Sequence, residues 1–306
     1  MRIGFAGLAH SHPHSDAANA VTLGASISGV SDPDPERRRA FAHRFGCPER
    51  ESVAALCADR PELIIATPHP SDLVRTAAAV LAAGIPAFFN KVVAATPRQL
   101  DAWEQVVASA PAGTIGTASV LRFAPAVAEL RRRTLGAEIL AVRVIAQHDN
   151  APFQTARQCW QDDPSVGGGT LVTVGVHAWE LVDTLLPGGV LTAASGWVRR
   201  RAGSATLSED AAGVTGRLAF ADRPPVPVQT TVTGLPGPDR YAIELLTTDG
   251  IRGVELDVSG PNHNLGFAGL VEQLLTRASR VPVDWRDGWN RVGNNPPAAP
   301  PAQASL

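Results

Sequence analysis

The stretch Arg2-Ile-Gly-Phe-Ala-Gly7-Leu-Ala-His-Ser-His12 decides the fold. Residues 2–7 form a short apolar run that ends at a glycine, and residues 16–23 have a composition suited to a helix. A second apolar run at 25–30 ends at Ser31-Asp32. This order predicts a β-α-β unit, which starts a parallel sheet with right-handed crossovers.

The same alternation of strands and helices continues to about residue 118. A helix is expected at 35–45, with Asp34 as its N-cap and Gly46 just after its end. Further strands are expected at 63–66, 86–89 and 114–118, and further helices at 72–83 and 97–108. We therefore predict an α/β fold in which residues 1–118 form a Rossmann-type, doubly wound, dinucleotide-binding domain.

The pattern changes after residue 118. Helices are expected at 127–133, 167–186 and 267–275, and a long strand at 139–146. Strand-like runs separated by Gly, Pro and Asp follow at 193–199, 214–220, 228–233, 242–247 and 253–258. These runs predict a C-terminal α+β domain over residues 119–292 with a large, mostly antiparallel sheet. The Pro- and Ala-rich residues 293–306 are expected to form a disordered tail.

Composition narrows the class of protein. Apolar residues make up 44% of the chain and charged residues 18%, as in soluble globular enzymes. The net charge of −2 offers no field for nucleic acid, and no apolar stretch approaches the roughly 18 residues that a membrane span needs. Cys47, Cys57 and Cys159 form no motif. We expect a cytoplasmic protein with a small-molecule substrate and with neither a nucleic-acid nor a membrane partner.

The loop at residues 7–12 occupies the positions of a G-x-G-x-x-G motif. Small residues in this motif let a pyrophosphate approach backbone amides at a helix N-terminus. Gly7 is retained, Ala9 still permits a close approach, and His12 fills the third glycine position. We expect Gly7, Ala9, His10, Ser11 and His12 to contact a dinucleotide.

Asp32 follows the second predicted strand and completes the nucleotide-binding pattern. A carboxylate at this place accepts hydrogen bonds from ribose hydroxyls and repels a 2′-phosphate, which favours NAD(H) over NADP(H). The alternative is a turn or capping aspartate, which is common in Ser-Asp-Pro sequences.

Three alternating histidines, His10, His12 and His14, raise the question of a metal. In an extended loop they would lie on one side, as metal ligands can. Pro13 and the expected helix start interrupt this geometry. We therefore predict no metal site and interpret these residues as loop histidines, one of which can contact phosphate.

Lys91 is the only lysine among 27 lysine and arginine residues, and it follows the predicted strand at 86–89. Arginine is bulkier and stays protonated, so a retained lysine indicates a position that needs an ammonium group. The alternative is a chance survivor on a solvated surface.

A third candidate group follows the glycine triplet at 167–169. On one continuous helix, Thr173, His177 and Glu180 stand at i, i+4 and i+7 and share a face. A histidine between two hydrogen-bonding residues is suited to proton transfer. From the residues alone, the alternative is a histidine satisfied inside a core helix.

Several of these segments resemble the Gfo/Idh/MocA family of oxidoreductases, and the resemblance covers nearly all of residues 2–292. The matching segments, in order, are Val30-Ser31-Asp32, Ile65-Ala66-Thr67-Pro68-His69, Asn90-Lys91-Val92, Trp160-Gln161-Asp162-Asp163-Pro164, the glycine triplet and Gly175-Val176-His177. Three positions depart from the family pattern: Asn90 replaces a glutamate, Val92 a proline and Thr173 an aspartate.

The resemblance implies an NAD(H)-dependent oxidoreductase. It would transfer hydride to or from a secondary alcohol or ketone of a sugar, cyclitol or related polar metabolite. Thr67, Pro68 and His69 would lie beneath the nicotinamide, with Asn90 and Lys91 beside it. Lys91 would orient both the substrate and the nicotinamide.

In the second domain, the resemblance implies that His177 exchanges the hydroxyl proton. Thr173 stands in the position of the aspartate, and Glu180, one turn further on, would supply some compensation. This domain would bind substrate and form the subunit interface of a homodimer or homotetramer. Two alternatives stay open: a homologue with a degenerate cofactor site that performs non-redox acid-base chemistry (elimination or isomerisation), and a non-catalytic ligand-binding homologue.

Overall fold

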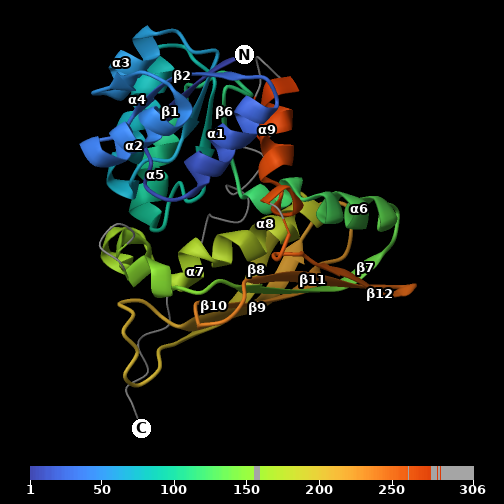
Figure 1. Ribbon diagram of the computed structural model, residues 1–306. Helices are drawn as coiled ribbons and strands as arrows, with labels where there is room; N and C mark the ends of the chain where they lie inside the picture. Colours follow the sequence, from blue (N-terminus) through green and yellow to red (C-terminus); the bar gives the residue numbers. More distant parts are fainter. Residues whose placement is uncertain (155–158, 261, 277–280, 282, 284–306) are drawn as a thin grey trace. The chain divides into compact units, whose positions relative to one another are not determined.

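The computed structural model describes residues 1–154, 159–260, 262–276, 281 and 283. Within them the chain forms two compact units (Figure 1). The first contains Met1–Ala118 and the described residues from Gly266 onward, and the second contains Ser119–Leu265. The proposed tail at 293–306 lies outside the described residues.

The first unit is built on a six-stranded parallel sheet with the strand order β3-β2-β1-β4-β5-β6. The strands are β1 (Arg2–Ala6), β2 (Ser26–Ser31), β3 (Glu49–Arg50), β4 (Leu63–Ala66), β5 (Ala87–Asn90) and β6 (Ile115–Ala118). Strands β4, β5 and β6 are buried along their whole length, which explains why they read as continuous apolar runs. The predicted doubly wound parallel sheet is confirmed. Its strand order reverses between β1 and β4, where ligands of such sheets bind.

Helices connect these strands: α1 (His12–Thr22), α2 (Pro35–Phe45), α3 (Val53–Ala58), α4 (Leu73–Ala82) and α5 (Pro97–Val107). The expected caps of α2 are present, because Asp34 accepts from the Glu36 and Arg37 amides and Gly46 adopts φ +62°. A further helix, α9 (Phe267–Thr276), packs beside α1 (Figure 1). It belongs to the first unit although it lies inside the range 119–292.

The second unit carries a mixed six-stranded sheet with the order β12-β11-β7-β10-β9-β8. Its strands are β7 (Ile139–Gln147), β8 (Val190–Arg199), β9 (Ala211–Ala219), β10 (Val226–Thr233), β11 (Arg240–Thr247) and β12 (Gly250–Glu255). Strands β7 and β10 are parallel, and the other neighbours are antiparallel. The predicted large, mostly antiparallel sheet is therefore confirmed.

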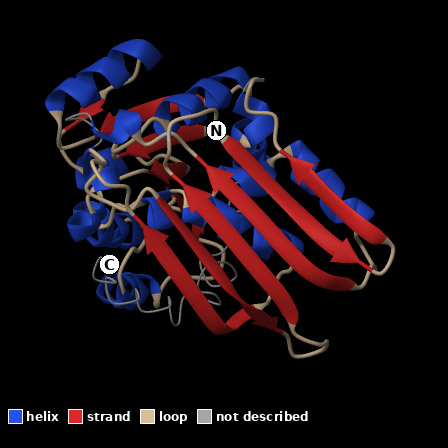
Figure 2. Cartoon of the chain, turned by 90° about the horizontal axis from the view of Figure 1, so that it is seen from below, coloured by secondary structure: helices blue, strands red, loops and turns tan. Residues whose placement is uncertain are grey.

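One face of this sheet is packed and the other is open. Side chains such as Val142, Val144 and Ile243 are buried on the face that contacts α8 (Gly175–Leu185). The alternate side chains, including Arg143 and Glu244, are exposed. Figure 2 shows this open face, which the described helices of the unit leave uncovered.

The remaining helices of the second unit are α6 (Pro125–Arg133) and α7 (Thr170–Thr173). Short 3₁₀ turns complete the described structure: η1 (Pro70–Asp72), η2 (Val120–Phe123), η3 (Ala151–Gln154), η4 (Cys159–Asp162), η5 (Pro164–Val166) and η6 (Asn262–Leu265). None of the described helices has the length and apolar content needed to span a membrane.

The expected continuous helix over 167–186 is wrong. Gly167 and Gly169 adopt φ values of +103° and +116°, which a helix cannot contain, and the helical segment breaks again at Val174 between α7 and α8. A Cβ on Gly168 would lie 2.1 Å from the Trp160 carbonyl oxygen, so the triplet serves a close backbone approach. Thr173 and His177 consequently stand on two successive helices.

Candidate functional site

The candidate residues form one group on the first unit and another on the second. The first-unit group follows the carboxyl ends of β1, β2, β4 and β5, which are neighbours in the sheet. The second-unit group lies on α7 and α8.

Gly7 lies where the ends of β1, β2 and β4 come together. Its φ is +86°, and a Cβ would lie 2.5 Å from the Pro68 Cα, so the position accepts only glycine. The Gly7 amide donates to the Ser31 carbonyl over 2.7 Å, and the Ala9 amide donates to the Thr67 carbonyl over 3.0 Å. The predicted loop is therefore fixed between the ends of β2 and β4.

Asp32 holds the same loop from the other side. It is buried, and its two carboxylate oxygens accept from the Leu8 amide at 2.6 Å and the Asp34 amide at 2.8 Å. Burial raises the pKa of Asp32 above its ordinary value. Asp32 therefore has the turn role that was the alternative interpretation of the sequence. Each oxygen keeps a second lone pair, so the predicted acceptance from ribose hydroxyls stays a prediction.

The three histidines do not gather around a common point. Because α1 begins at His12, His14 packs instead against Phe41, with ring centroids 5.2 Å apart. The His12 ring contacts His10 at 4.3 Å and Phe267 at 4.9 Å. Among the described residues, no three His, Cys, Asp or Glu side chains are placed to hold a metal ion.

His10 lies beside Lys91 in the interior of the first unit. Its Nδ1 accepts from the His12 amide at 3.2 Å. Burial and the positive charge of Lys91 lower the pKa of His10 to about 3, although a hydrogen bond to the Lys91 backbone opposes this. His10 is therefore a neutral ring near pH 7.

Lys91 is half-buried directly after β5, and the Lys91–Val92 peptide bond is cis. Burial lowers the pKa of Lys91 to about 8. A lysine in this range can carry or release a proton near neutral pH, which arginine cannot do. The need for a lysine at this position stays a prediction.

Asn90, which stands where the resembled family pattern has a glutamate, contacts a carboxylate supplied by another element. Its Nδ2 donates to Asp16 Oδ2 on α1 at 3.0 Å and to Thr67 Oγ1 at 2.9 Å. A carboxylate, that of Asp16, therefore lies beside position 90, and sequence reasoning overlooked it. The available signal was an aspartate inside the alanine-rich run of α1.

Two buried acceptors at this contact have no hydrogen-bond partner among the described residues: Asp16 Oδ1 and Asn90 Oδ1. Asp16 is fully buried, and burial raises its pKa to about 7. Buried acceptors without donors are sites for a proton, a water or a ligand N–H or O–H. A proton on Asp16 is one way to satisfy both acceptors.

The other candidates at this edge are more exposed. Pro68 and His69 follow β4, and the His69 Nδ1 lies 2.8 Å from the Ser71 hydroxyl. Burial lowers the pKa of His69 below its ordinary value. Ser11 is exposed and precedes α1 without a side-chain capping bond.

In the second unit, His177 is 5% exposed and is fixed on two sides. Its Nδ1 lies 2.6 Å from the Ser119 hydroxyl, and its ring meets Tyr241 edge to face with centroids 5.3 Å apart. The Thr173 hydroxyl donates to the carbonyl of Gly169, the N-cap of α7, at 2.8 Å.

Glu180 supports the serine. Its Oε2 accepts from the Ser119 amide at 2.8 Å, and Arg122 bonds both Glu180 and Asp183. Burial raises the pKa of Glu180, although Arg122 opposes this. These contacts form a chain to His177: Arg122 bonds Glu180, Glu180 accepts from the Ser119 amide, and the Ser119 hydroxyl contacts the ring.

Sequence reasoning missed Ser119, Arg122 and Tyr241. Ser119 immediately follows the predicted strand that ends at Ala118, and a polar residue at a strand end was the available signal. Tyr241 is the chain's only tyrosine but lies inside an alternating strand, where nothing marks it as a site residue.

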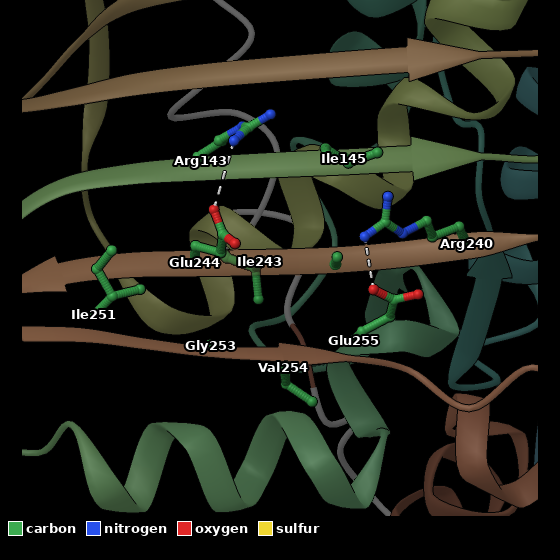
Figure 3. Close-up of a pocket in the computed structure, with 10 residues that line it drawn as sticks. Arg143, Ile145, Arg240, Ile243, Glu244, Ile251, Gly253, Val254 and Glu255 are labelled. Atoms are coloured by element: carbon green, nitrogen blue, oxygen red, sulfur yellow. Dashed lines mark hydrogen bonds and ion pairs between the residues drawn. The ribbon is translucent and has the colours of Figure 1, made fainter.

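A separate pocket lies on the open face of the second sheet (Figure 3). Two ion pairs cross it, Arg143 with Glu244 at 3.8 Å and Arg240 with Glu255 at 2.7 Å. The candidate residues of either group do not line it.

The sequence matches no protein-family model and no curated protein significantly. Solved structures with the same fold are numerous. GenD2 from gentamicin A biosynthesis, in complex with NAD, has 17% identity and a TM-score of 0.72, covering 91% of this chain and 86% of GenD2. A myo-inositol dehydrogenase from Corynebacterium glutamicum has 14% identity and a TM-score of 0.74, covering 94% and 90%.

A third similar structure is the UDP-N-acetylglucosamine 3-dehydrogenase GnnA from Acidithiobacillus ferrooxidans. It has 16% identity and a TM-score of 0.70, covering 93% of this chain and 91% of GnnA. The fold expected from the resemblance to the Gfo/Idh/MocA oxidoreductases is confirmed by these structures.

Proposed function

We propose that the chain is a divergent Gfo/Idh/MocA oxidoreductase that uses NAD(H) on a secondary alcohol or ketone of a sugar, cyclitol or related polar metabolite. The observation that carries the proposal is the position of its only lysine. Lys91 directly follows β5, two strands from β1, and its neighbour Asn90 bonds Thr67, which directly follows β4. Proteins of the same fold include dehydrogenases of myo-inositol and of UDP-N-acetylglucosamine.

The cofactor proposal rests on the edge formed by β1, β2, β4 and β5. Gly7, Ala9, His10, Ser11 and His12 would face the pyrophosphate, and Asp32 the adenosine ribose. Thr67, Pro68, His69, Asn90 and Lys91 would face the nicotinamide ribose and ring. NAD(H) would supply or accept the hydride. The buried carboxylate of Asp32 supports NAD(H) over NADP(H), because it would repel a 2′-phosphate.

The residues of the chain have distinct roles in this proposal. Lys91 orients the substrate oxygen and the nicotinamide, and His177 is the proton-transfer group. Thr173, four residues before His177, is proposed as a further catalytic residue on sequence grounds. Glu180 acts on His177 indirectly. Its carboxylate accepts from the Ser119 amide at 2.8 Å, and the Ser119 hydroxyl contacts the His177 ring.

The rival is a homologue that performs non-redox acid-base chemistry, and one observation favours it. His12 occupies the third glycine position and packs its ring against His10 and Phe267 at the start of α1, where a phosphate would approach. Pro13 follows and lacks an amide N–H at this helix start. A ligand-binding homologue without catalysis is the third possibility.

Calorimetric titration with NADH and NADPH tests the proposal against both. We expect micromolar NADH binding and weaker NADPH binding, and we expect Lys91→Met to weaken the NADH complex or its turnover. Arg98→Met, which removes one exposed positive charge from α5, is the control and should change neither. No binding of either nucleotide at millimolar concentration would leave only the two rivals.

We further propose a homodimer or homotetramer that forms through the open face of the second sheet. Exposed apolar side chains on β8, β11 and β12, among them Trp197, Leu246 and Ile251, support this surface. A reducing cytoplasm is consistent with the free thiols of Cys47 and Cys57. A small molecule remains the proposed partner, with neither nucleic acid nor membrane.

A further inference from the structure

We infer that His148 and Asp239 form a subsite that binds two neighbouring hydroxyl groups of a polyol substrate. The inference rests on the proposed function and deepens it, because it names a vicinal diol as the part of the substrate that the second unit recognises. Both residues belong to that unit, and sequence reasoning singled out neither of them.

The two residues face each other at one end of the second sheet. Strands β7 and β11 pair Gln147 with Arg240. His148 and Asp239 are the residues immediately beyond this pair, so they occupy the next opposed positions. The His148 amide donates to the carbonyl of Thr233, the last residue of β10, at 3.0 Å. This bond fixes the chain where it leaves β7.

The contacts of the His148 ring decide which nitrogen a ligand can use. Its Nδ1 lies 2.9 Å from the Asp149 carbonyl oxygen. A carbonyl oxygen only accepts, so the proton of the neutral ring is on Nδ1 and the lone pair is on Nε2. The ring stacks on Phe153, with centroids 5.1 Å apart and planes inclined by 18°. His148 therefore holds a hydrogen-bond acceptor in a fixed place.

Asp239 adds a second acceptor beside this nitrogen. Its Oδ2 lies 3.7 Å from His148 Nε2, which is too far for a hydrogen bond between them. Among the described residues Asp239 has no other ion pair, because the adjacent Arg240 bonds Glu255 instead. The two side chains are 31% and 35% exposed, so a ligand can reach both.

Two acceptors side by side are complementary to two donors. A single hydroxyl has one proton and satisfies one acceptor, and a ketone oxygen satisfies neither. Adjacent hydroxyls on a sugar or cyclitol ring lie next to each other and supply one proton to each acceptor. The bond to the carboxylate is charge-assisted and is the stronger of the two. The pair therefore favours a vicinal diol over an isolated alcohol.

The subsite is connected to the proposed proton-transfer group through Tyr241. Asp239 lies two residues before Tyr241, whose ring meets the His177 ring with centroids 5.3 Å apart. Burial raises the pKa of Tyr241, and the negative charge of Asp239 raises it further, so the field of this carboxylate reaches the tyrosine hydroxyl. The subsite can thus hold one part of a polyol while His177 acts on another.

Nitrogen NMR of the full chain with ¹⁵N-labelled histidine tests the subsite without cofactor. His148→Phe identifies the signals of this ring by their loss. Above the pH at which the ring becomes neutral, we expect a protonated Nδ1 and an unprotonated Nε2. The Nε2 signal should shift on addition of at least one of myo-inositol, scyllo-inositol and D-glucose, but not on addition of cyclohexanol or cyclohexylamine. A proton on Nε2, no response to any of the three polyols, or a response to cyclohexylamine overturns the inference.

Two substitutions separate substrate recognition from a structural role of the ion pair. Asp239→Asn should raise the KM for the polyol about tenfold, as for a lost hydrogen bond to a charged acceptor, and leave the KM for NAD⁺ unchanged. His148→Phe, which keeps an aromatic ring on Phe153, should have the same effect. Glu129→Gln, which removes an exposed carboxylate paired with Arg132, is the control and should change neither constant. An unchanged polyol KM in both variants, or an equal rise for NAD⁺, would contradict the assignment.

Failure of this inference and failure of the proposed function are distinguishable. If a polyol shifts the Nε2 signal but neither NADH nor NADPH binds, only the proposed function fails. If NADH binds and a polyol is turned over with the same KM in wild type, Asp239→Asn and His148→Phe, only the subsite fails.

Discussion

Replacing Asp16 by Asn should remove a pH-dependent loss of stability from the first unit. Asp16 is fully buried and is bonded through one oxygen to Asn90. Burial raises its pKa from 3.8 to about 7. Between these values the folded protein holds a proton that the unfolded chain has released, so the free energy of unfolding falls as the pH rises.

The magnitude follows from the width of this window. Each pKa unit corresponds to about 1.4 kcal/mol, so the full rise amounts to about 4 kcal/mol. Between about pH 5 and pH 7 the wild-type protein should lose about 2 kcal/mol through this one group, and about 0.4 kcal/mol more above the folded pKa. Asparagine imitates the protonated acid, because it can accept from Asn90 Nδ2 and donate to the unpartnered Asn90 Oδ1.

Amide hydrogen exchange in β1 and β4 gives the opening free energy of the first unit itself. The quantity to follow is the difference between Asp16→Asn and wild type at the same pH, which cancels the other titrating groups. We expect the variant to gain about 3 kcal/mol on wild type between about pH 5 and about pH 8. Asp101→Asn, on the exposed side of α5, provides the matched control. A difference that stays constant over this range would refute the argument that Asp16 is a buried neutral acid.

Three further substitutions test the fold and the proposals. Gly7→Ala should destabilise the first unit by several kcal/mol more than Gly24→Ala in thermal unfolding: both residues have φ near +85°, but only Gly7 faces backbone at 2.5 Å, and equal losses would disprove the close approach. His177→Ala should abolish any turnover in a steady-state assay with NAD⁺ and a panel of cyclitols and sugars, and wild-type-like rates would rule out its role in proton transfer. Ile251→Arg, at an exposed position of β12, should shift the mass found by light scattering toward the monomer, whereas an unchanged oligomer would place the interface elsewhere.

The sequence determined the class of each sheet, because strand and helix periods and their punctuation are local properties. Alternation of apolar runs and helices over 1–118 predicted the parallel sheet, and the turn-separated strands after 190 predicted the antiparallel one. It also identified Gly7, Lys91 and His177 as candidates, since a strand-end glycine, a sole lysine and a motif histidine are visible without coordinates.

Tertiary packing decided which side chains meet. Asp16 bonds Asn90 across 74 positions, and Ser119 meets His177 across 58. No local period encodes these pairs, because each depends on how a helix packs against a segment that is distant in the sequence. The continuous helix expected over 167–186 is absent for a related reason. The conformation of its glycines follows from their close approach to the Trp160 carbonyl, and not from helix propensity. The residues that contact Asn90 and His177 could therefore be identified only from the tertiary structure.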